Sequence, residues 1–160
     1  MNRRTTFTVT GMTLLGLAIA ALPEVGFAQS NPLIGAWKLN LDKSKYSSGT
    51  APRSLTLNYQ QDGQNIRNAT QGIDAQGSPT AGVLMHIYDG QPHPSTGSPL
   101  FDASAYTRVD ANTVIFSRSK AGKLQSIGSG VVSQDGKTMT VTTTGTAGQG
   151  GTDIAVYDKQ

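Results

Sequence analysis

Apolar and polar residues alternate in short runs along most of the chain after residue 28. A period of two places successive side chains on opposite faces of a β-strand. No apolar run of useful length has the helical period. We therefore expect eight to ten short strands, from runs at 33–41, 55–59, around Ile66, 83–87, 106–108, 114–116, 123–132, 139–143 and 154–159.

Turn-forming residues separate these runs, with Asp-Gly pairs at 62–63, 89–90 and 135–136. Asp-Gly suits a tight hairpin because Gly adopts positive φ freely and Asp tolerates it. Short connections predict an antiparallel up-and-down meander, and closing it into a barrel would remove its two edges. Three segments are expected outside the strands: a polar linker at 42–52, a proline-containing loop or edge at 91–99, and a flexible hairpin loop at 145–151.

The first 28 residues have the layout of a secretory signal peptide. Arg3 and Arg4 precede an apolar stretch at 11–22, which is shorter than the roughly 20 residues of a membrane-spanning helix. Gly26 and Ala28 are the small residues of a cleavage site. We expect cleavage after Ala28 and export to the periplasm or the medium, with an uncleaved membrane anchor as the alternative. The paired arginines leave both ordinary secretion and the twin-arginine route open.

The expected mature domain, residues 29–160, has a composition typical of β-structure. It holds 11 Lys or Arg, nine Asp and no Glu, and the whole chain lacks Cys. Glycine is abundant, with 19 in the chain, which disfavours helices and favours strands with tight turns. The positive charges form no basic stripe, so we expect no nucleic-acid partner. We expect one disulfide-free domain without a stable membrane span, and the sequence does not indicate its oligomeric state.

Motifs at both ends of this domain resemble the calycin superfamily of lipocalins and fatty-acid-binding proteins. Gly35 and Trp37 form a Gly-x-Trp motif on the first expected strand, and the last strand, 154–159, reads Ile-Ala-Val-Tyr-Asp-Lys. The whole domain also resembles exported bacterial proteins described as lipocalin-like. The resemblance implies a calycin barrel in which the Trp closes one end beside a basic side chain of the final strand, here Lys159.

The resemblance has two departures. Fatty-acid-binding proteins hold the ligand carboxylate with an Arg two residues before the Tyr of the last strand, where this chain has Ala155. The helical pair that covers their cavity is not expected, because residues 42–52 are too few and include Pro52. The resemblance therefore implies the barrel but not the carboxylate site.

Few side chains of the domain are suited to catalysis. It has no Cys or Glu, only two histidines, and no motif of serine hydrolases, phosphate loops or zinc proteases. We therefore expect no enzymatic activity, no metal and no cofactor. His86 shares a strand face with Leu84 and Tyr88, as a surface or barrel-wall histidine would. The alternative is a metal site of His86, His93 and Asp89, since imidazole and carboxylate suit zinc or copper.

The candidate ligand-binding residues are Tyr106, Arg108, Arg118 and His86. Tyr106 and Arg108 share one face of a strand, and Arg118 falls in the middle of another. An Arg pointing into the barrel could meet an anionic group of a ligand, whereas one pointing outward would be an ordinary solvated side chain. The sequence leaves both orientations open.

The sequence predicts an exported, non-enzymatic barrel that binds a small, largely apolar molecule inside. One alternative is an interaction or inhibitor module of the cell envelope that uses the loops at one barrel end, above all 91–99. A weaker alternative is an enzyme with His86 or His93 as its base. A hollow interior would favour the first reading, and a solid one would exclude it.

Overall fold

The computed structural model describes residues 31–47, 51–145 and 150–160, so the expected signal peptide and its cleavage site lie outside the described residues. Within these ranges the chain forms ten β-strands and no helix, and so no helix that could cross a membrane. The strands are β1 (Gly35–Lys45), β2 (Ser54–Asp62), β3 (Asn65–Ile73), β4 (Pro79–His86), β5 (His93–Thr96), β6 (Ala103–Arg108), β7 (Thr113–Lys120), β8 (Lys123–Val132), β9 (Thr138–Gly145) and β10 (Thr152–Lys159).

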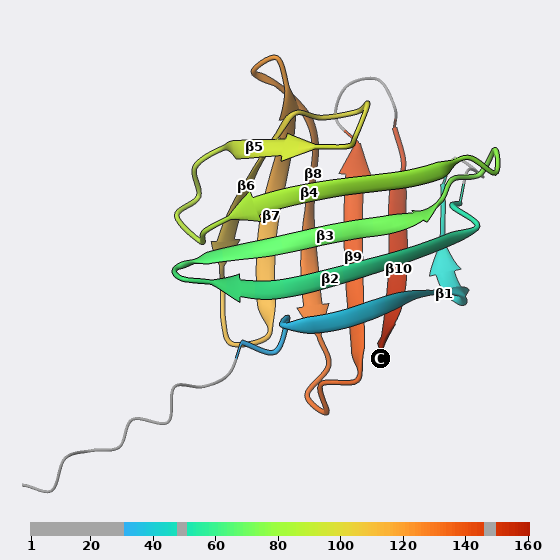
Figure 1. Cartoon of the computed structure of the whole chain (residues 1–160), viewed down its shortest axis with the longest axis horizontal. Helices are drawn as coiled ribbons and strands as arrows, with labels where there is room; N and C mark the ends of the chain where they lie inside the picture. The colour runs from blue at the N-terminus through green and yellow to red at the C-terminus, as the bar shows by residue number, and fades with distance from the viewer. Residues whose placement is uncertain (1–30, 48–50, 146–149) are drawn as a thin grey trace, which may run out of the picture.

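The ten strands close into a barrel. Each strand pairs antiparallel with the next along the chain, and β1 pairs with β10 to complete the ring. In Figure 1 the strands β2 to β5 form a front layer that crosses the layer of β6 to β10 behind it at a steep angle. The predicted all-β meander closed into a barrel is confirmed.

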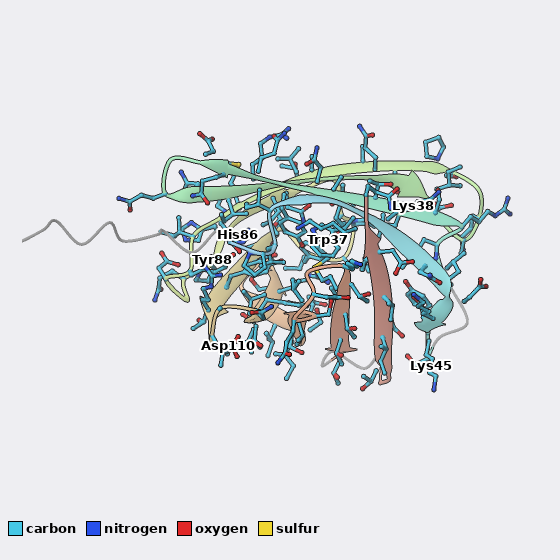
Figure 2. The ribbon with its side chains drawn as sticks, turned by 90° about the horizontal axis from the view of Figure 1, so that it is seen from below. Trp37, Lys38, Lys45, His86, Tyr88 and Asp110 are labelled. Atoms are coloured by element: carbon cyan, nitrogen blue, oxygen red, sulfur yellow. The ribbon has the colours of Figure 1, made fainter. Side chains whose placement is uncertain are left out.

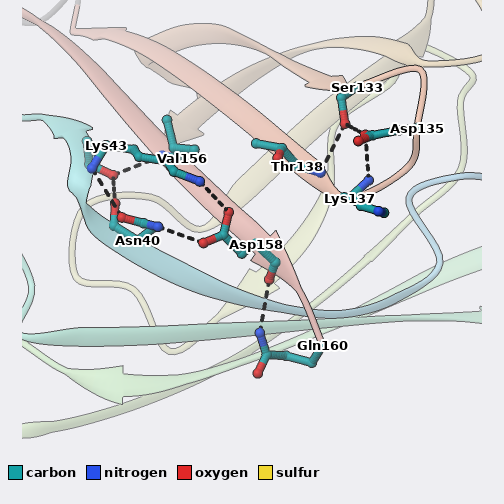
Figure 3. Close-up of polar contacts among 10 residues, drawn as sticks. Asn40, Lys43, Ser133, Asp135, Lys137, Thr138, Val156, Asp158 and Gln160 are labelled. Atoms are coloured by element: carbon teal, nitrogen blue, oxygen red, sulfur yellow. Dashed lines mark hydrogen bonds and ion pairs between the residues drawn. The ribbon is translucent and has the colours of Figure 1, made fainter.

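The connections β2–β3, β4–β5, β6–β7 and β8–β9 lie at one end of the barrel, which we call the Trp37 end. Gly63, Gly90 and Gly136 have φ values of 60°, 72° and 69° there, as their Asp-Gly pairs predict. The Asp135 carboxylate accepts hydrogen bonds from Ser133 Oγ at 2.6 Å and Lys137 N at 3.1 Å (Figure 3). These bonds hold the β8–β9 turn. The connections β1–β2, β3–β4, β5–β6, β7–β8 and β9–β10 lie at the opposite end, the loop end.

Trp37 fills the barrel at the end named after it. Its side chain is fully buried, and its Nε1 donates a hydrogen bond of 2.8 Å to the Leu33 carbonyl. Lys159 is its cross-strand partner, and the Lys159 Nζ lies 4.9 Å from the Trp37 ring centroid. Gly35 has φ 128°, and a Cβ there would press on the Lys159 side chain. The three residues named for barrel closure therefore lie together.

Alternation along each strand separates the interior from the surface. Inward-facing residues such as Leu57, Tyr106 and Phe116 are buried, and their neighbours in sequence are more exposed. On β4 the buried residues are Leu84 and His86. The face that carries Val83, Met85 and Ile87 is therefore the outer one.

Parts of two segments expected outside the strands belong to strands. Residues 42–45 of the expected linker extend β1, past a register shift between Asn40 and Lys45. Asp158 of β10 holds this irregular segment, because it accepts bonds from Asn40 Nδ2 at 2.6 Å and Lys43 Nζ at 3.2 Å (Figure 3).

The second correction concerns residues 91–99. Their middle forms β5, which bridges β4 and β6 through two residue pairs on each side. Pro94 fits because the strand is so short that it needs few backbone donors. Most of the expected 145–151 loop lies outside the described residues.

Candidate ligand-binding cavity

A cavity of about 730 Å³ occupies the barrel between the two layers. Much of its wall is apolar, from both layers, and includes Leu57, Val141 and Met139. It reaches down to Leu33 near the Trp37 end and extends up to residues of the loop-end connections, among them Gly97. The interior that the sequence left undecided is therefore hollow.

His86 lies in the wall of this cavity and is almost completely buried, with 1% of its surface exposed. Its ring stacks on Tyr106 with centroids 4.0 Å apart, and Tyr88 meets it edge-on at 5.5 Å (Figure 2). Burial, with a smaller contribution from His93, lowers the pKa of His86 to about 4. The imidazole is therefore neutral at pH 7. Neither ring nitrogen has a hydrogen-bond partner among the described residues.

Arg118 also lines the cavity, from the loop-end half of β7. Its guanidinium carbon lies 4.5 Å from the Phe116 ring centroid and 4.8 Å from that of Phe101. Within the described ranges no carboxylate lies within 4.0 Å of it, and its buried Nε has no hydrogen-bond partner. Asp153, at the loop end of the wall, accepts bonds of 2.8 Å from Ser47 instead. Arg118 thus has no carboxylate partner in the described part of the chain, and its side chain hydrogen-bonds that of Tyr106.

Three buried tyrosines complete the polar lining, on β2, β6 and β10: Tyr59, Tyr106 and Tyr157. Burial raises the pKa of each phenol above its ordinary value, and the nearby positive charge of Arg118 opposes this only in part. All three therefore keep their protons at neutral pH and can donate hydrogen bonds.

Arg108 lies apart from the cavity, although it shares a strand face with Tyr106. Its side chain turns to the Trp37 end and donates bonds to the carbonyls of Asp110 at 3.0 Å and Ala111 at 2.7 Å. Its guanidinium also lies 5.5 Å from the Tyr88 ring centroid. Three of the four candidate residues, Tyr106, Arg118 and His86, line the cavity, and Arg108 instead holds the β6–β7 turn.

The alternative metal site is not assembled. His93 Nε2 lies 3.0 Å from the Asp89 carboxylate, on the β4–β5 side of the Trp37 end. No group of three or more potential ligand residues in the described part of the chain is arranged to hold a metal ion. His86 faces the interior, away from such a pair of ligands.

Sequence reasoning missed Asn68, Tyr59 and Tyr157 as cavity residues. Asn68 is buried in the middle of β3, and its Oδ1 has no hydrogen-bond partner among the described residues. A signal existed, because each of these polar residues lies two positions from an inward apolar or small residue: Ile66, Leu57 and Ala155.

Comparison with known proteins identifies the fold. No protein-family model and no curated protein sequence matches the chain. Among solved structures, a Schistosoma mansoni fatty-acid-binding protein in complex with arachidonic acid superposes with a TM-score of 0.58 at 15% identity, over 82% of this chain and 98% of that one. The chain has the fold of a fatty-acid-binding protein.

Two further structures agree with this fold. A protein described as the REP1-NXSQ fatty acid transporter gives a TM-score of 0.54 at 17% identity, over 80% of this chain and 96% of the other. Apo lipid binding protein 8 of Caenorhabditis elegans gives 0.53 at 13% identity, over 82% and 97%. These structures have the barrel fold that the motifs at the two ends of the sequence led us to expect. In this barrel Ala155 is part of the β10 wall, and Arg118 on β7 lines the same cavity.

Proposed function

We propose that the protein binds one small amphipathic molecule, with the apolar body inside the barrel and an anionic group beside Arg118, and does not transform it. The observation that carries this proposal is the apolar cavity of about 730 Å³, with a guanidinium in its wall that has no carboxylate partner among the described residues. Its volume falls within the roughly 300–1,000 Å³ typical of small-molecule sites. Two of the similar structures are described with arachidonic acid or as a fatty acid transporter, which supports the same ligand class.

The anionic group follows from the energetics of buried charge. A cation held away from water is costly unless a partner neutralises it. Arg118 is half-buried, its Nε is buried without a partner, and two aromatic rings and the Tyr106 side chain are the neighbours of its guanidinium. A carboxylate near the loop end would satisfy this charge with charge-assisted hydrogen bonds.

The absence of catalysis is supported by the surroundings of His86. A general base is usually oriented by a second group, such as a carboxylate. His86 instead stacks on Tyr106, and no described residue bonds either of its nitrogens. It can accept or donate a hydrogen bond to a ligand without being positioned to move a proton.

Displacement of 1-anilinonaphthalene-8-sulfonate fluorescence by oleate and by methyl oleate tests the binding proposal. Arg118→Gln should weaken oleate binding about tenfold or more, because it removes a charge-assisted contact, and should leave methyl oleate nearly unchanged. Arg67→Gln is the matched control, since Arg67 lies on the outer face of β3. If oleate does not displace the dye from the wild-type protein, or if both variants weaken it equally, the proposal fails.

We also propose that the barrel works outside the cytoplasm after removal of residues 1–28. The basic start, the short apolar stretch and the small residues before Gln29 support this. Intact-mass measurement of the protein from the periplasm of an expressing bacterium should give a chain that begins at Gln29. A full-length chain that stays with the membranes would support the anchor alternative instead.

A further inference from the structure

Every buried side-chain nitrogen or oxygen without a partner in the described ranges belongs to a residue that lines the cavity. These atoms are Arg118 Nε, Asn68 Oδ1 and both ring nitrogens of His86. Native proteins satisfy nearly all buried polar atoms, so a cluster of exceptions needs an explanation. The anionic group of the proposed function accounts for Arg118 and leaves the other three atoms without a partner.

Asn68 and His86 are close enough for one ligand group to reach both. In the β3–β4 register Asn68 pairs with Leu84, and Ile66 pairs with His86. Both side chains point inward, so they are diagonal neighbours on one face of the sheet, whose Cα atoms are about 7–8 Å apart. An atom between them can be in hydrogen-bond range of both.

This pair lies deeper in the barrel than Arg118. β4 runs from the loop end to the Trp37 end, and His86 is its last residue. Arg118 lies in the loop-end half of β7, two residues beyond Phe116, the cross-strand partner of Tyr106. Tyr106 links the two sites, because its ring stacks on His86 and its side chain hydrogen-bonds Arg118. A ligand held at Arg118 therefore has the His86 side chain within its reach.

The hydrogen-bonding capacity of the pair selects the chemistry of the group. A neutral imidazole offers one N–H donor and one acceptor nitrogen, and the amide oxygen of Asn68 is a second acceptor. A hydroxyl both donates and accepts, so it can bond both residues at once. A carboxylate would face two acceptors, and a bare methylene would leave all three atoms unsatisfied, which is costly.

We propose that the preferred ligand is a hydroxylated apolar acid, with its carboxylate at Arg118 and a chain hydroxyl bonded to Asn68 and His86. This inference rests on the proposed function, because it assigns a second recognition point in the same cavity. It predicts selectivity between two acids that differ only by one oxygen atom.

Isothermal titration calorimetry on delipidated protein, residues 29–160, with stearate and its 3-, 10- and 12-hydroxy derivatives tests the proposal. At least one hydroxystearate should bind about tenfold more tightly than stearate, the gain expected from one to two neutral hydrogen bonds. His86→Phe, which keeps the stacked ring, and Asn68→Leu should each reduce this preference, the ratio of the stearate Kd to the hydroxystearate Kd, at least threefold. Asn58→Leu is the matched control on the exposed face of β2 and should keep the preference.

The outcomes separate the hydroxyl site from the proposed function on which it rests. If stearate binds and no hydroxystearate binds more tightly, the hydroxyl site is refuted and the proposed function stands. If no acid binds, both fail. If either cavity variant does not fold, a long-range ¹H–¹⁵N spectrum of the wild-type protein replaces it. The preferred hydroxystearate should then move the His86 nitrogen signals relative to stearate, and identical spectra would overturn the proposal.

Discussion

Replacing His86 by Phe should make the unliganded barrel more resistant to mild acid. In the folded protein burial lowers the pKa of His86 to about 4, whereas an unfolded chain has a His pKa near 6.5. Between these pKa values the His86 imidazole is protonated in the unfolded chain and neutral in the folded protein. The free energy of unfolding must therefore fall as the pH is lowered through this window. Phe cannot titrate, so the variant loses this dependence.

The size of the effect follows from the two pKa values. Each pKa unit corresponds to about 1.4 kcal/mol, and between pH 7 and pH 5 His86 should remove about 2 kcal/mol from the free energy of unfolding. Surface carboxylates act mainly below this range. The pKa values of Asp89, Asp110 and Asp135 lie below the ordinary 3.8, because backbone and side-chain hydrogen bonds stabilise their charged forms.

Urea denaturation followed by the fluorescence of Trp37, the only Trp in the chain, measures this difference. The assay compares the wild-type protein with His86→Phe at pH 7, 6 and 5. The gap should widen by about 2 kcal/mol in favour of the variant from pH 7 to pH 5. A gap that stays constant with pH would refute a neutral, buried His86.

Three further substitutions test the fold around the cavity. Lys159→Met should lower the free energy of unfolding by about 0.5–1 kcal/mol through loss of the cation–π contact with Trp37; an unchanged urea midpoint would contradict that contact. Gly128→Ala should cost about 1–3 kcal/mol, because its Cβ would overlap a neighbouring backbone carbonyl and an aromatic ring. Gly150→Ala, which meets nothing, is the control, and equal midpoints for the two would refute the tight packing. Arg108→Met should lower the melting temperature, at a cost of about 1 kcal/mol, without changing the affinity for oleate, because its partners are turn carbonyls. Weaker oleate binding with an unchanged melting temperature would show instead that Arg108 takes part in ligand binding.

The sequence was sufficient to predict the strands and their turns because both signals are local. A period of two marks each strand, and Asp-Gly marks the hairpins at Gly63, Gly90 and Gly136. The expectation that residues 42–45 and 93–96 lie outside the strands was wrong for a different reason. Polar and proline-containing residues can belong to a barrel when a bulge or a very short strand removes the need for regular pairing, as at β1 and β5.

The composition of the cavity could be predicted only in part. Arg108 and Arg118 look equivalent in sequence, but Arg108 bonds the carbonyls of the turn that directly follows its strand. The surroundings of Arg118 depend on barrel closure, which places it in the cavity wall. The same long-range pairing turns the Leu84 and His86 face of β4 inward and leaves Met85 outside. Asn68 became a candidate only when its register partner and its unbonded oxygen were known.

The claim that the barrel holds an apolar ligand in its interior can be tested most directly with two methyl groups. Once residues 1–28 are removed, the chain has two methionines. Met139 is fully buried in the cavity wall, and Met85 lies on the outer face of β4. With ¹³C-methyl-labelled Met and unlabelled oleate, isotope-filtered NOEs should connect the oleate methylenes to Met139 and not to Met85. NOEs to Met85 alone, or to neither methyl in saturated protein, would contradict an internal ligand.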